Sequence, residues 1–135
     1  MTALAQDRNT PLRDGREFTF PVAAAKKIYA GALVCLNATG FATPGAVATT
    51  LKTVGRASAQ VDNSLGADGA VTVTVRRGVF RFANSAAADL IAAADIGADC
   101  YVVDDQTVAK TNGAATRSIA GKIRDVDAQG VWVEI

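Results

Sequence analysis

The C-terminal residues of the chain alternate strictly in side-chain character. Val131, Val133 and Ile135 would share one face of an extended segment, whereas Trp132 and Glu134 would share the other, because side chains along a strand alternate with a period of two. This alternation predicts a strand that forms one wall of a core. We therefore expect no residues after it for targeting or anchoring.

A turn and another strand-like segment come directly before these residues. Residues 127–130 (Asp-Ala-Gln-Gly) are polar and end in glycine, and residues 119–126 are rich in apolar side chains. Together they predict a C-terminal β-hairpin with a four-residue loop. Such an ending indicates a compact β-protein that acts through its surfaces.

The strongest strand pattern covers residues 71–82. Its apolar positions are odd-numbered through Val75 but even-numbered at Phe80 and Phe82. A shift of phase within one strand is what a β-bulge produces, so we predict a bulge centred on Gly78.

Residues 17–22 predict the first strand, with Phe18, Phe20 and Val22 directed to the core and Pro21 at an edge or a strand end. A long strand is expected over residues 49–61.

That long strand is expected to bend at Gly55.

Residues 84–95 are the only segment with a helical composition, and Asn84 or Ser85 could cap it. A loop with a short turn fits the same residues, so both alternatives stay open.

The whole pattern comprises about nine short strands, at most one short helix, and turns every 8–12 residues or so. It predicts an all-β protein, a small sandwich or barrel, with residues 17–135 as a single domain.

Residues 1–16 are polar and of mixed charge, so we expect an extended N-terminal arm that becomes ordered when something binds it. A frayed terminus is the alternative.

The composition argues against most kinds of reactive site. The chain has no histidine, which excludes Ser-His-Asp and Cys-His systems and zinc sites that use histidine. Neither GxGxxG nor GxxxxGK[ST] occurs, so no phosphate-binding loop is predicted. Cys35 and Cys100 lie in apolar runs and are predicted to be buried, reduced thiols, with a disulfide or a reactive thiol as alternatives.

Two acidic pairs could in principle bind a hard cation or act as general acid and base. These are Asp104 with Asp105, and Asp125 with Asp127. Each pair lies at a predicted turn, where aspartate is favoured because its side chain bonds the local backbone. We therefore predict turn residues, no catalytic, metal-binding or cofactor-binding site, and no enzymatic activity.

The charge pattern is balanced. Fourteen basic and thirteen acidic residues leave a net charge of +1, which provides no long-range field for nucleic acid or an anionic membrane. Arg76, Arg77 and Arg81 form the densest positive patch. We expect them on a solvated or subunit-facing strand, with polyanion binding as the alternative.

Membrane insertion and secretion are not predicted. No apolar run approaches the ~20 residues that span a bilayer, and the first eight residues lack the apolar region of a signal peptide.

Read in order, these segments resemble the capsid decoration (cement) proteins of tailed double-stranded DNA bacteriophages. The matching stretches are strands and turns, and the last two are the most similar: residues 22–41, 53–57, 71–82, 92–105 and 119–135. The shared pattern is a structured entry, a strand, an Asp-led turn and a closing hairpin that contains glycine.

The resemblance implies a β-domain that binds the outside of the virion as a homotrimer. The tulip-like arrangement known in that family is one form that this domain could take. The partner would be the major capsid protein; no nucleic acid, membrane or small-molecule partner is implied, and the protein would be made in the host cytoplasm. The arm would lie across neighbouring capsid subunits through Arg8, Pro11, Leu12, Arg13 and Arg16. Contacts between subunits of the trimer would involve Arg76, Arg77, Arg81 and Trp132.

A receptor- or glycan-binding module of a phage tail or fibre is the alternative function. It would also be a small β-oligomer without catalytic groups. Sugar sites favour exposed aromatic rings, for which Tyr29, Tyr101 and Trp132 are the candidates.

Overall fold

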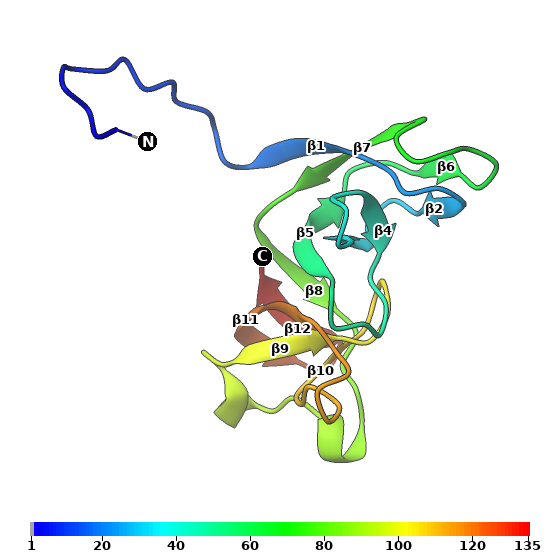
Figure 1. Cartoon of the computed structure of the whole chain (residues 1–135). Coiled ribbons are helices and arrows are strands. Elements are labelled where there is room, and N and C mark those ends of the chain that lie inside the picture. The colour runs from blue at the N-terminus through cyan, green and yellow to red at the C-terminus, as the bar shows by residue number, and fades with distance from the viewer. Residues whose placement is uncertain (1) are drawn as a thin grey trace.

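The computed structural model describes residues 2–135 and shows an almost entirely β structure (Figure 1). The first sheet has the order β1 (Glu17–Pro21), β7 (Thr72–Arg76), β5 (Lys52–Ala57), β3 (Leu33–Leu36), β4 (Ala42–Pro44). The second has the order β10 (Val108–Ala109), β9 (Asp99–Val102), β11 (Ile119–Asp127), β12 (Gly130–Glu134), β8 (Val79–Phe82). A third, two-stranded sheet joins β2 (Lys26–Ile28) to β6 (Val61–Asn63).

The sheets pack as a sandwich and not as a closed barrel, so of the two predicted architectures the sandwich is correct. Strand β3 explains why. Leu33 and Cys35 belong to a core shared with the second sheet, whereas Val34 belongs to a core on the opposite face, beside Val73 and Val75. Both faces of β3 are therefore buried, and this is why its sequence is continuously apolar instead of alternating.

The predicted bulge at Gly78 is wrong. Strand β7 ends at Arg76 in the first sheet, and β8 begins at Val79 in the second, so residues 77–78 cross between the sheets. The shift in apolar phase marks a change of core, because the valines of β7 and Phe82 of β8 pack in different clusters. The N–H of Ile135 donates to the Gly78 carbonyl at 2.9 Å and so ties the crossover to the last residue.

The first predicted strand is confirmed as β1, which lies at the edge of its sheet and ends at Pro21. Val22 is fully buried, and Phe18 and Phe20 are half-buried against the same core.

The predicted long strand over residues 49–61 is shorter and divided. Strand β5 ends at Ala57, and β6 joins the third sheet. Beside Gly55, where a bend was predicted, the pairing with β3 is irregular: it passes from Thr53 directly to Gly55, which leaves Val54 as an extra residue.

The segment 84–95 is not an α-helix, so the loop alternative is correct. It contains two 3₁₀ turns, η1 (Ala87–Asp89) and η2 (Ala93–Asp95). Asn84 does not cap a helix. Its side-chain amide spans the loop instead, accepting the N–H of Ile91 at 3.0 Å and donating to the Ile91 carbonyl at 2.9 Å. Ile91 is thereby held in the core.

The C-terminal hairpin is confirmed as β11 and β12, with a shorter loop than expected. Asp127 and Gly130 already pair across the strands, so only Ala128 and Gln129 lie between the paired residues. The Asp127 carboxylate accepts the N–H groups of Gln129 at 2.8 Å and Gly130 at 3.0 Å, which explains an acidic residue at this position.

Candidate interaction surface

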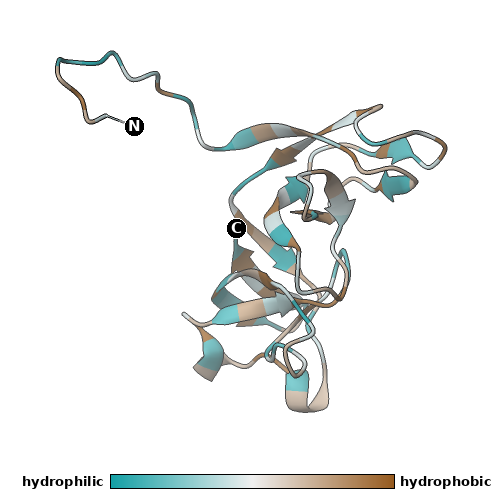
Figure 2. Cartoon of the chain, viewed as in Figure 1, coloured by the Kyte–Doolittle hydropathy of each residue, from teal (hydrophilic) through white to brown (hydrophobic). Residues whose placement is uncertain are grey.

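Residues 2–16, here called the arm, project from β1 away from the body (Figure 1). Every residue of the arm is exposed, including Leu4 and Leu12, the latter with 98% of its surface accessible. Figure 2 shows hydrophobic and hydrophilic stretches along the arm, far from either core. All five residues predicted to contact the capsid, Arg8, Pro11, Leu12, Arg13 and Arg16, lie on this segment.

The arm is attached to the body at its C-terminal end. The Arg16 carbonyl accepts the N–H of Arg77 at 2.7 Å, and the Arg13 guanidinium lies 5.1 Å from the centre of the Phe18 ring. Arg16 and Asp14 form an exposed ion pair at 3.9 Å, which contributes little to stability. The direction in which the arm leaves the body is therefore set by a backbone bond and a cation–π contact.

Four arginines gather at this attachment point: Arg13, Arg16, Arg76 and Arg77. We call them the basic rim. Arg76 pairs in register with Glu17 on one side and with Arg56 on the other. Among residues 2–135, no carboxylate lies within ion-pair distance of Arg76 or Arg77. Asp14 and Glu17 lie beside these arginines and offset part of the charge of the basic rim, whereas Arg76 and Arg77 keep a positive charge without an ion pair among residues 2–135.

An open apolar hollow of about 400 Å³ lies beside the basic rim. It is lined by Phe18, Phe20, Thr53, Val54, Arg77 and Ile135, which come from β1, β5, the crossover and the last residue of the chain. The half-buried Phe18, Phe20 and Val54 pack against one core and Ile135 against the other. The hollow therefore lies at the surface, between side chains that pack against the two different cores.

The other two predicted subunit contacts, Arg81 and Trp132, are brought together but are already used within the chain. They pair in register across β8 and β12, with the guanidinium 5.6 Å from the indole centre. The indole N–H donates to the Asp127 carboxylate at 2.8 Å. That bond is the main cause of a pKa of Asp127 below its ordinary value, and the backbone N–H of Gln129 adds to it.

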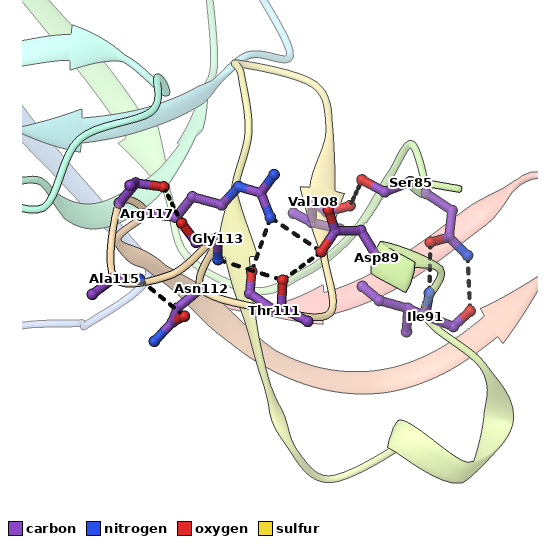
Figure 3. Close-up of polar contacts among 11 residues, drawn as sticks. Ser85, Asp89, Ile91, Val108, Thr111, Asn112, Gly113, Ala115 and Arg117 are labelled. Carbon is purple, nitrogen blue, oxygen red and sulfur yellow. Dashed lines mark hydrogen bonds and ion pairs between the residues drawn. The ribbon is translucent and has the colours of Figure 1, made fainter. Parts of the chain in front are cut away.

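A polar clamp, formed by Asp89, Thr111 and Arg117, joins the loop 84–95 to the loop 110–117 (Figure 3). Asp89 accepts from the Thr111 hydroxyl and from the Arg117 guanidinium, the latter at 3.2 Å. These two bonds lower the pKa of Asp89, the hydroxyl contributing most. Arg117 also donates to the Thr111 carbonyl at 3.1 Å, so the clamp is closed on itself.

The remaining candidate groups serve structure. Cys35 and Cys100 are free and buried as predicted, and burial raises their thiol pKa to about 11 and about 12, which opposes formation of a reactive thiolate. Asp104 accepts the Gln106 N–H at 2.9 Å, which confirms its predicted turn role.

Residues 2–135 contain neither a metal-binding cluster nor a membrane-spanning helix. No group of three or more Cys, Asp or Glu side chains is placed to hold a metal ion. In the same part of the chain, no helix has the length and apolarity to cross a bilayer.

A scan against protein-family models, a search of curated proteins and a search of solved structures all found no match.

Sequence reasoning found the arm and the arginines but missed the apolar hollow. The hollow joins residues that are distant in sequence, and only the packing of the two sheets brings them together. One signal was available in the sequence. Phe18 and Phe20 come just before Pro21, which predicts an edge strand or the end of a strand, and aromatic side chains at an edge have few neighbours to cover them.

Proposed function

We propose that this protein is a capsid cement protein that binds the outer surface of an assembled phage head as a homotrimer and stabilises contacts between major capsid proteins. The resemblance of its strand and turn segments to phage decoration proteins motivates the proposal. The all-β sandwich is compatible with it.

The observation that carries the proposal is the exposed arm. The segment presents Leu12 at 98% exposure, and Arg8 is exposed with it, while among these side chains only Arg13 touches the body, through the Phe18 ring. Its attachment to β1 fixes where it begins, while its length lets it cover a neighbouring surface. Such a segment suits a partner that offers an extended apolar and acidic track.

The stabilising effect would be thermodynamic linkage. A ligand that binds only the assembled shell stabilises that shell, by roughly 2.7 kcal/mol for each site at a free concentration about 100-fold above its Kd. Three arms on one trimer would engage together, so weak single contacts would become durable attachment.

The test is a pair of truncations mixed with undecorated heads and imaged by electron microscopy. Deletion of residues 2–16 should abolish decoration while circular dichroism still shows a folded β-protein and the particle mass still corresponds to three chains. Deletion of residues 2–6 is the matched control, because it shortens the arm but keeps all five proposed contact residues, and it should still decorate. Full decoration by the longer deletion would refute the role of the arm.

One observation favours the glycan-binding alternative. Tyr29 is 55% exposed and borders a polar hollow lined also by Asp105 and Gln106, a combination that sugar sites use. Lys27 lies over the same ring at 5.1 Å and competes for its face. A glycan array probed with the wild type and Tyr29→Ala would decide: binding lost in the variant supports this function, and no binding by the wild type removes it.

A further inference from the structure

The tip of the loop between β6 and β7 carries a leucine with no neighbour in the chain. Leu65 is fully accessible to solvent, with a relative exposure of 103%. Asp62 and Asp68 lie three residues to either side, so the loop is an apolar tip with acidic flanks. Lys27 lies opposite Asp62 in the third sheet, and neither Asp62 nor Asp68 forms an ion pair among residues 2–135.

This loop is held firmly in place. The side-chain amide of Asn63, which is almost fully buried, donates to the carbonyls of Val22 at 3.2 Å, Ala23 at 3.0 Å and Ala67 at 3.0 Å. The Asp68 carboxylate accepts the Ala24 N–H at 2.7 Å. A leucine presented on a rigid loop loses little conformational freedom on binding, which favours a docking role.

The apolar hollow is the complementary surface on the same molecule. It offers the rings of Phe18 and Phe20 and the side chain of Ile135 for contact, and Arg77 supplies an unpaired positive charge at its edge. A volume of about 400 Å³ is ample for one leucine side chain.

We propose that Leu65 of one copy inserts into the apolar hollow of a second copy, with Asp68 facing the basic rim. Charge favours this leucine over Leu12, which is the other leucine with almost complete exposure. Leu12 adjoins Arg13 and would bring a like charge to Arg77, whereas the Leu65 loop brings a carboxylate.

The two surfaces are different parts of the body. The loop follows β6, which Figure 1 shows at the right, whereas the hollow is lined by residues of β1 and β5, by Arg77 and by the last residue of the chain. Contacts between different surfaces of identical copies are head-to-tail, and they close into a ring when the rotation permits. The inference rests on the homotrimer of the proposed function and supplies its junction.

The experiment measures self-association without heads, by sedimentation velocity over a concentration series. Leu65→Ser should raise the dissociation constant at least about tenfold, since burial of a leucine is lost at each junction. Leu12→Ser is the matched control, an equally exposed leucine in the arm, and should associate like the wild type. An unchanged mass for Leu65→Ser, or a wild type that stays monomeric at its solubility limit, would overturn the proposal.

A charge exchange tests the pairing of the two surfaces. Arg77→Glu should weaken association because it places a carboxylate opposite the acidic loop, and Ala67→Lys should weaken it by placing a cation opposite Arg77. The double variant should recover association. Failure of the double variant to recover, while both single variants dissociate, would contradict the facing of these residues.

Mixing two defective chains tests the head-to-tail arrangement. Arg77→Glu keeps an intact Leu65 loop, and Leu65→Ser keeps an intact hollow, so the mixture should form dimers with one junction and nothing larger. Rings in the mixture would overturn the model. Decoration of heads by the wild type is scored separately. A wild type that decorates as a monomer would refute this junction but keep the cementing role, whereas a wild type that associates through Leu65 but does not decorate would keep the junction and refute the cement function.

Discussion

At the scale of single residues, Gly55 occupies a position with no room for a side chain. It has φ +153°, and a Cβ there would lie 2.6 Å from the Arg76 carbonyl oxygen, a backbone atom. We expect Gly55→Ala to lower the free energy of unfolding by about 1–3 kcal/mol, because the β5–β7 pairing must shift. Urea denaturation followed by Trp132 fluorescence would measure it.

Gly15→Ala is the control for that substitution, because nothing lies within 4 Å of the Cβ it would add. It should change the free energy of unfolding by less than about 0.5 kcal/mol. Equal effects of the two substitutions would show that the close approach at Gly55 does not limit the fold.

Asp127 makes stability depend on pH. Its pKa is lowered in the folded chain, chiefly by the hydrogen bond from the Trp132 indole. The stabilising contribution is therefore fully present above the ordinary value of 3.8 and is lost as the pH falls through the lower, folded value. In Asp127→Asn the loss below pH 3.8 should be smaller than in the wild type, as measured by Tm from pH 7 downward. Parallel profiles for the two proteins would contradict this role.

At the scale of elements, the polar clamp should control how often the two loops at that end of the second sheet open. Arg117 bonds both Asp89 and the Thr111 carbonyl, so Arg117→Met removes the guanidinium but keeps an unbranched side chain that can replace its aliphatic part. We expect amide exchange of Ile91 to become roughly tenfold faster, while amides of the third sheet stay unchanged. Hydrogen exchange by mass spectrometry resolves the two regions, and a uniform acceleration would indicate global destabilisation instead of a local clamp.

Strands and turns were predictable from sequence where their signals are local. The C-terminal hairpin follows from the alternation around Trp132 and from an aspartate that bonds its own turn. The change of sheet between β7 and β8 was not predictable from sequence. A shift in the phase of the apolar residues looks the same whether a strand bulges or the chain crosses to another core. Within the candidate site, composition revealed the arm, but the hollow depends on packing between distant elements such as β1 and Ile135.

At the scale of the whole molecule, cementing should follow mass action. If the trimer binds only intact heads, each tenfold rise in free protein above Kd should add about 1.4 kcal/mol per occupied site to head stability. The disruption temperature of heads, followed by light scattering, should therefore rise with the logarithm of the free protein concentration, and it should keep rising after all sites are occupied. The chain lacking residues 2–16 should leave that temperature at the value of bare heads. A disruption temperature that does not respond to the wild-type concentration would mean that the protein attaches without preferring the assembled shell, and attachment of that kind cannot stabilise a capsid.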